Sequence, residues 1–187
     1  MRREDFVPLE SRRDAYVDEP IRIARGQVTS QPSLIARMIE ALELGGGERV
    51  LEVGTGLGFQ TALLTQLGRE VYSIERFPEL AAQAMANLSA AGIAGVTVVV
   101  GDGTLGLPEH APFEAIVVSA AAPRVPPALA EQLAEGGRLV QPIGPGGAEI
   151  VTLYRKREGR VEKDAELTGA YFVRLVGEQG MRERGDG

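Results

Sequence analysis

The sequence contains no cysteine and only one histidine, His110, among its 187 residues. The absence of cysteine excludes a disulfide-stapled fold, a thiolate metal site and a cysteine nucleophile. A single histidine leaves too few side chains for a Ser-His-Asp triad or for a metal site built from several imidazoles. We therefore expect no bound metal and no chemistry that relies on a thiol.

Long apolar runs are also missing from the chain. The longest uncharged stretch, residues 80–101, has the length of a membrane span, but polar residues and glycines interrupt it and its period changes midway. This pattern predicts a helix, a turn and a buried strand. The N-terminus carries alternating charges and no apolar core, which excludes a secretory signal peptide. We expect a cytoplasmic protein without membrane contact.

Positive charge is in deficit, since the formal net charge is −6. A chain with a net negative charge lacks the excess of basic residues that is typical of nucleic-acid-binding proteins. Hydrophobic residues make up 44% and charged residues 25%, a balance typical of globular proteins that bury a core. The length predicts one domain, and we expect a monomer.

Strand-like and helix-like segments alternate along most of the chain, which predicts an α/β fold. Predicted strands lie at 49–53, 71–75, 96–100, 115–118 and 138–141, and predicted helices at 32–42, 60–67, 78–90 and 126–133. Such alternation favours a mainly parallel sheet with helices on both faces. In the tail, residues 150–154 and 170–176 are expected to be strands joined by the charged turn 155–164, which predicts an antiparallel C-terminal edge.

The expected single domain, residues 1–187, divides into four parts. Residues 1–30 form an irregular N-terminal segment, and residues 31–144 form the α/β core. Residues 145–178 supply the C-terminal strands, and residues 179–187 are expected to be frayed.

A candidate cofactor site lies in residues 50–59, VLEVGTGLGF, where a strand runs into a glycine-rich turn and then a helix. At the carboxyl edge of a parallel sheet, such a turn lets the backbone approach a nucleotide closely. Glu75 ends the next strand, 21 positions after Gly54, and this spacing suits a carboxylate that binds the two ribose hydroxyls. Asp102 and Gly103 end the third strand, where they are expected to reach an adenine edge.

The turn itself indicates which adenosine cofactor fits. A dinucleotide fingerprint needs a small residue at its sixth position, because a pyrophosphate lies against the backbone there. Here that position is Phe59, and the third glycine, Gly58, comes one place early. The spacing favours a cofactor without phosphates, and S-adenosylmethionine fits. Nicotinamide binding, or a merely structural turn with solvated acids, remain the alternatives.

Several blocks, in this order along the chain, resemble the protein-L-isoaspartate O-methyltransferases. They extend from about residue 6 to 176, and the combination of Ser-Gln-Pro with Ala-Ala-Ala-Pro is specific to that family among methyltransferases. The blocks are FVP (6–8), AYVD (15–18), GQVTSQP (26–32), VLEVGTGLGFQTALL (50–64), SIER (73–76), GDG (101–103), APF (111–113), VSAAAP (118–123) and GGRLVQPIG (136–144).

The resemblance implies a Rossmann-like, S-adenosylmethionine-dependent methyltransferase fold and a repair activity. The family transfers a methyl group to the free α-carboxyl of L-isoaspartyl residues in damaged proteins and peptides. With the turn and the strand ends, it assigns cofactor contacts to Gly54, Thr55, Gly56, Gly58, Phe59, Glu75, Arg76, Asp102, Gly103 and Ser119. Expected substrate contacts are Thr29, Gln31, Ala120 and Ala121.

Ser30 matches the family's active-site serine in the Ser-Gln-Pro block. Its hydroxyl is expected to donate a hydrogen bond to the incoming carboxylate and to aim one oxygen at the methyl group. A carboxylate with a pKa near 4 is already ionised at pH 7, so no general base is needed and the enzyme must mainly align the reactants. A plain helix N-cap is the other interpretation of this serine, and both can hold together.

The segments that frame the substrate in the family differ here. The chain begins near FVP, without the family's usual N-terminal helical segment. It has PIRIAR (20–25) where the family favours Pro-Leu-Pro-Ile-Gly, Val28-Thr29 for Thr-Ile, and Arg174 for a proline. Arg22, Arg25 and Arg174 either form a cationic rim for a peptide carboxylate or are solvated. Two alternatives therefore stay open: a methyltransferase for normal aspartate in one dedicated peptide, and a non-catalytic S-adenosylmethionine-binding protein.

Overall fold

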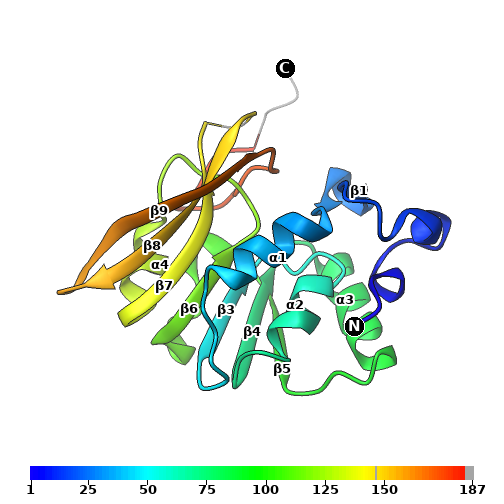
Figure 1. Cartoon of the computed structure of the whole chain (residues 1–187), viewed down its shortest axis with the longest axis horizontal. Coiled ribbons are helices and arrows are strands. Elements are labelled where there is room, and N and C mark those ends of the chain that lie inside the picture. Colours follow the sequence, from blue (N-terminus) through cyan, green and yellow to red (C-terminus); the bar gives the residue numbers. More distant parts are fainter. Residues whose placement is uncertain (146, 184–187) are drawn as a thin grey trace.

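The computed structural model describes residues 1–145 and 147–183 and is dominated by a seven-stranded sheet in the order β5-β4-β3-β6-β7-β8-β9 (Figure 1). Neighbouring strands are parallel from β5 to β7, whereas β8 and β9 run antiparallel. The predicted α/β sheet with an antiparallel C-terminal edge is confirmed. The strands are β3 (Arg49–Val53), β4 (Glu70–Glu75), β5 (Val96–Val100), β6 (Phe113–Val118), β7 (Leu133–Ile143), β8 (Glu149–Arg157) and β9 (Arg160–Ala170).

Helices cover both faces of this sheet because its central strands are apolar on both sides. One core cluster joins α1 and α2 to Val50, Val71 and Val117, and a second joins α4 to Leu51 and Ile116 on the opposite face. The helices are α1 (Pro32–Glu40), α2 (Phe59–Leu64), α3 (Pro78–Ala90) and α4 (Pro127–Gln132). Within the described parts of the chain, no helix is both long and apolar enough to cross a membrane.

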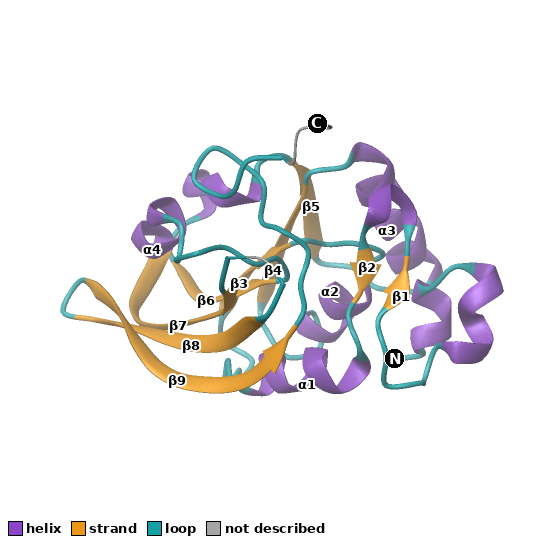
Figure 2. Cartoon of the chain, turned by 90° about the horizontal axis from the view of Figure 1, so that it is seen from above, coloured by secondary structure: helices purple, strands orange, loops and turns teal. Residues whose placement is uncertain are grey.

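The N-terminal segment has more structure than the sequence indicates. It forms 3-10 helices η1 (Arg3–Phe6), η2 (Leu9–Asp14) and η3 (Ala24–Gly26), and strands β1 (Ile21–Arg22) and β2 (Val28–Thr29) pair antiparallel. Phe6 is fully buried in a cluster with Ala62 and Leu88. Figure 2 shows β1 and β2 beside α3, close to the carboxyl edge of the large sheet.

The prediction for the C-terminal strands was wrong in its boundaries. Strand β9 begins at Arg160, inside the expected charged turn, and the real turn is Glu158-Gly159. As an edge strand, β9 carries exposed charged side chains, so no alternating apolar pattern marks it. Residues 171–176 do not pair with β8. They run instead beside the loop after β6, where Arg174 bridges to Ala121.

Backbone hydrogen bonds hold residues 179–181 to the fold, so the expectation of a frayed end was wrong for these three residues. The backbone N–H of Gln179 donates to Thr104 Oγ1 at 3.1 Å, and that of Met181 donates to the carbonyl of Leu175 at 2.7 Å. Residues 184–187 lie outside the described residues.

Candidate active site

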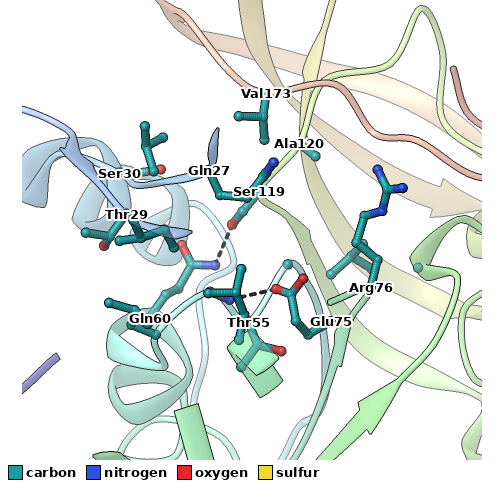
Figure 3. Close-up of a pocket in the computed structure, with 18 of the residues that line it drawn as sticks. Gln27, Thr29, Ser30, Thr55, Gln60, Glu75, Arg76, Ser119, Ala120 and Val173 are labelled. Carbon is teal, nitrogen blue, oxygen red and sulfur yellow. Dashed lines mark hydrogen bonds between the residues drawn. The ribbon is translucent and has the colours of Figure 1, made fainter. Parts of the chain in front are cut away.

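A cavity opens at the carboxyl ends of β3, β4 and β6, with an empty volume of about 840 Å³ including its mouth (Figure 3). This is the place in which α/β proteins hold small ligands. The floor is the glycine-rich turn, one wall is the N-terminal segment around residues 27–30, and another is the segment 173–176. The walls therefore come from both ends of the chain.

The turn between β3 and α2 brings bare backbone to the cavity. Gly54 and Gly56 line it with φ angles of +97° and +58°, which side chains other than glycine rarely adopt. Thr55 and Phe59 line it too. Gly58 does not, because it faces α3, where an added Cβ would lie 3.3 Å from Leu88 Cγ. Its predicted cofactor contact is replaced by close packing between α2 and α3.

Two acidic residues predicted for the cofactor take different places. Glu75 lines the cavity, where its carboxylate accepts from the backbone N–H groups of Gly56 at 2.9 Å and Phe77 at 3.1 Å. These bonds fix the carboxylate and leave lone pairs for a ligand. Asp102 does not line the cavity, since its oxygens accept from Thr104 and from the N–H of Glu178 at 2.7 Å.

The neighbouring Gly103 does line the cavity. A Cβ there would lie 2.4 Å from Val53 Cγ1, so only glycine fits. Burial alone would raise the pKa of Asp102, but the hydrogen bonds from Glu178 and Thr104 outweigh it and hold that pKa below its ordinary value. The carboxylate of Asp102 therefore anchors the C-terminal segment.

Ser30 lies at the junction of the cavity and a second groove between α1 and the ends of β8 and β9, and lines both. Helix α1 has Gln31 as its N-cap residue and no side-chain capping bond, so the N-cap interpretation of Ser30 was wrong. The Ser30 hydroxyl makes no hydrogen bond with any residue in 1–145 or 147–183. Thr29 lines the cavity, whereas Gln31 lines the groove.

Arg3 holds Ser30 in place, and the sequence analysis missed it. Its side chain is buried, and its guanidinium donates to the carbonyl oxygens of Ala15 and, at 2.8 Å, of Ser30. The guanidinium also lies 5.8 Å from the centre of the Phe59 ring. Burial lowers the pKa of Arg3 from its ordinary value. Only its position in a charged N-terminus was visible in the sequence, and that indicated a solvated side chain.

A buried polar network lies beneath the turn. Ser119 lines the cavity, and its Oγ accepts from Gln60 Nε2 at 2.9 Å. The same nitrogen donates to Oε1 of Glu52 at 3.0 Å. Glu52 is fully buried and also accepts from the hydroxyls of Thr61 and Ser73. Burial raises its pKa to about 7, against the effect of these hydrogen bonds.

The C-terminal segment reaches the cavity through Ala121. The N–H of Ala121 donates to the Val173 carbonyl at 2.8 Å, and the Ala121 carbonyl accepts from the N–H of Leu175 at 2.7 Å. Ala121 is buried and lines neither the cavity nor the groove, so its predicted substrate contact is replaced by this pairing. Ala120 does line the cavity, as does Arg174.

The predicted arginines at the cavity and its proposed rim lie in different environments. Arg76 lines the cavity, lies over the Phe77 ring and pairs with Glu183. Arg25 pairs with Glu79 and does not line the cavity, and Arg22 is exposed. Of the proposed cationic rim, only Arg174 lies at the cavity.

Comparison with known proteins agrees with this geometry. Residues 1–180 match the family described as Protein-L-isoaspartate(D-aspartate) O-methyltransferase (PCMT). The protein-L-isoaspartate O-methyltransferase of Methanoculleus marisnigri is 50% identical over 177 residues, which cover 95% of this chain and 80% of that protein. The enzyme of the same name from Aeropyrum pernix is 49% identical, over 95% of this chain and 70% of that one.

Solved structures show the same fold. A protein-L-isoaspartate O-methyltransferase superposes with a TM-score of 0.84 at 30% identity, covering 96% of this chain, which spans 60% of that longer one. A putative enzyme of this type from Plasmodium falciparum, in complex with S-adenosyl-L-homocysteine, superposes with a TM-score of 0.74 at 25% identity, covering 93% and 85% of the two chains. The sequence match, its coverage and the shared fold establish that this chain belongs to the protein-L-isoaspartate(D-aspartate) O-methyltransferase family.

Proposed function

We propose that this chain methylates the α-carboxyl of L-isoaspartyl residues in damaged proteins, with S-adenosylmethionine as methyl donor. The observation that carries the proposal is the position of Ser30. Its hydroxyl, without a hydrogen-bond partner in the described chain, lies where the cavity at the glycine-rich turn meets a groove that opens to the surface. A methyl donor held in one space and a peptide in the other would meet at this side chain.

The residues of the cavity fit an adenosine cofactor that lacks phosphates. Glu75 presents a fixed carboxylate suited to ribose hydroxyls, and Gly103, packed closely against Val53, brings bare backbone to the cavity. Phe59 occupies the turn position where a pyrophosphate would need a small residue. We assign cofactor contacts to Gly54, Thr55, Gly56, Phe59, Glu75, Arg76, Gly103 and Ser119, and substrate contacts to Thr29, Gln31 and Ala120.

When bound, S-adenosylmethionine supplies the methyl group, and its sulfonium provides the leaving group. The task of this chain is to align and enclose the reactants. Ser30 donates a hydrogen bond from its hydroxyl to one oxygen of the substrate carboxylate, which orients the other oxygen toward the cavity. Because a carboxylate is ionised at neutral pH, no side chain has to remove a proton. The N-terminal segment and residues 173–176 line the cavity on two sides.

The experiment that tests this function uses radiolabelled S-adenosylmethionine and two peptides that differ only in one isoaspartyl or normal aspartyl linkage. Base-labile label on the isoaspartyl peptide alone is the expected result. Label on the aspartyl peptide alone would overturn the proposal in favour of the dedicated-peptide alternative. The peptide pair is also tested with a panel of different flanking residues. If the protein binds the cofactor but labels none of these peptides, it is a non-catalytic binding protein.

The proposal includes a monomeric enzyme that works in the cytoplasm on proteins and not on nucleic acids. The net charge of −6 opposes binding to a phosphate backbone. Size-exclusion chromatography with light scattering tests the oligomeric state.

A further inference from the structure

The side-chain amide of Gln60 has a fixed orientation at the cavity wall. Both hydrogens of its nitrogen are used, since Nε2 donates to Glu52 Oε1 at 3.0 Å and to Ser119 Oγ at 2.9 Å. Figure 3 shows the amide of Gln60 reaching from α2 to Ser119. Its carbonyl oxygen accepts no hydrogen bond from the described residues and belongs to a cavity-lining side chain. Gln60 therefore offers the cavity an acceptor.

Glu52 imposes this orientation. Its carboxylate receives three donors, from Gln60, Thr61 and Ser73, and is fully buried below the turn. Above its pKa of about 7, the carboxylate of Glu52 can only accept hydrogen bonds, so the end of the amide that then faces Oε1 must be the nitrogen. If the amide were reversed, two oxygens would face each other in a site without water access, which is strongly unfavourable.

Ser119 completes a complementary pair. Its oxygen accepts from Gln60, so its own proton remains available to donate toward the cavity. The wall between β3 and β6 thus carries one acceptor, the Gln60 oxygen, beside one donor, the Ser119 hydroxyl. Glu75, which suits ribose hydroxyls, lies at the end of β4 on the other side of the turn (Figure 3).

We propose that Gln60 and Ser119 bind the α-amino acid end of the methyl donor, and that Glu52 is the positioning residue that aims Gln60 at it. The acceptor of Gln60 receives a hydrogen bond from the α-ammonium group, and the hydroxyl of Ser119 donates to the α-carboxylate. This inference rests on the proposed function and adds to it the residues that recognise the zwitterion.

The test measures binding alone, by calorimetry, with two nucleosides that share the adenosine and the thioether. S-adenosylhomocysteine has the amino acid end, and 5′-methylthioadenosine lacks it. For Gln60→Met, we expect about a 10-fold weaker affinity for S-adenosylhomocysteine, as for a lost hydrogen bond to a charged group. The affinity for 5′-methylthioadenosine should stay within about twofold of the original protein.

Glu52→Gln separates positioning from packing. A glutamine at this position keeps the shape but can present its own amide hydrogens to Gln60, which allows that amide to turn around. We expect a selective loss of S-adenosylhomocysteine affinity of about fivefold, smaller than for Gln60→Met. The matched control is Thr61→Val, which removes another hydrogen bond to Glu52 and leaves Gln60 in place. It should lower the unfolding temperature without changing the preference between the two nucleosides.

Equal losses for both nucleosides in Gln60→Met would overturn the inference, as would unchanged binding of both. The same selective loss in Thr61→Val would overturn the positioning role of Glu52. These outcomes are distinct from failure of the proposed function, in which the unmodified protein would bind neither nucleoside or would methylate no isoaspartyl peptide. Circular dichroism establishes that each variant is folded before binding is measured.

Discussion

The cofactor side and the substrate side of this cavity are built in different ways. The cofactor side comes from short continuous stretches at the ends of two neighbouring strands. These are the turn that follows β3 and Glu75, the last residue of β4. The substrate side consists of two segments far apart in the sequence. Residues 27–30 are held by the buried Arg3, and residues 173–176 are held by their pairing with Ala121. The first is specified by local pattern, whereas the second exists only when distant segments meet. Variants that affect one side and spare the other test this division.

The largest expected effect concerns the buried charge under the cofactor side. The pKa of Glu52 is about 7 in the folded protein, against an ordinary value of 4.5. The folded state therefore retains a proton between these values that the unfolded state has lost, and stability falls as pH rises through this window. The fall amounts to about 3 kcal/mol in unfolding free energy. Denaturant unfolding at pH 5 and pH 8.5 measures it.

Glu52→Gln should remove this fall, so the difference in slope between the two proteins isolates Glu52. Other carboxylates with lowered pKa values, such as Asp102, titrate at more acidic pH and affect both proteins equally. Parallel pH profiles for the two proteins would contradict the buried charge.

The next effect concerns the substrate side. Ser30→Ala should lower kcat on an isoaspartyl peptide by about 100-fold, because a donor aimed at the reacting carboxylate is lost. The affinity for S-adenosylhomocysteine should stay within about twofold, since the cofactor side is untouched. Ser89→Ala, at an exposed position on α3, is the control. Unchanged turnover in Ser30→Ala would remove this serine from the catalytic machinery.

Glu75→Gln is expected to have the opposite effect to Ser30→Ala, weakening cofactor binding and sparing the peptide. The substitution replaces the carboxylate that suits ribose hydroxyls, and we expect about a 20-fold loss of S-adenosylhomocysteine affinity, as for a charge-assisted hydrogen bond. The KM for the peptide, measured at saturating methyl donor, should change by less than about twofold. A loss confined to the peptide KM would show that the division between the two sides is wrong.

The smallest effect tests the long-range anchor. Arg3→Met preserves much of the buried volume but removes the hydrogen bond to the Ser30 carbonyl. We expect kcat to fall about fivefold with little change in cofactor affinity, because Ser30 loses its fixed position. Arg12→Met, an exposed substitution in η2, is the matched control. If Arg3→Met weakened cofactor and peptide binding equally, Arg3 would support the fold as a whole and not Ser30 in particular.

The same division explains what the sequence could predict. Strands 49–53 and 96–100 and the helix 78–90 were predicted with their observed bounds, because apolar runs, prolines and glycines mark them locally. The cavity-lining places of Gly54, Glu75 and Ser119 follow from strand ends in a parallel sheet. By contrast, β9 is a charged edge strand, and Asp102 is engaged by Glu178, which lies 76 positions away. No local pattern reports such contacts.

Gln60 and Glu52 show a third case. Both stand inside the motif that indicated the cofactor, but their roles depend on hydrogen bonds made across the turn to Ser73 and Ser119. Periodicity gives the positions of these residues on α2 and β3, but it cannot show which buried polar groups become partners.

The cavity wall formed by residues 173–176 has a consequence for the synthesis of the protein on the ribosome. Translation proceeds from the N-terminus, so the nucleotide-binding strands and the serine emerge long before the segment that closes over them. Until that later segment has been made, the chain has the glycine-rich turn without this wall of the cavity. The complete cavity therefore forms only after residues 173–176 have been made and have packed against the loop that follows β6.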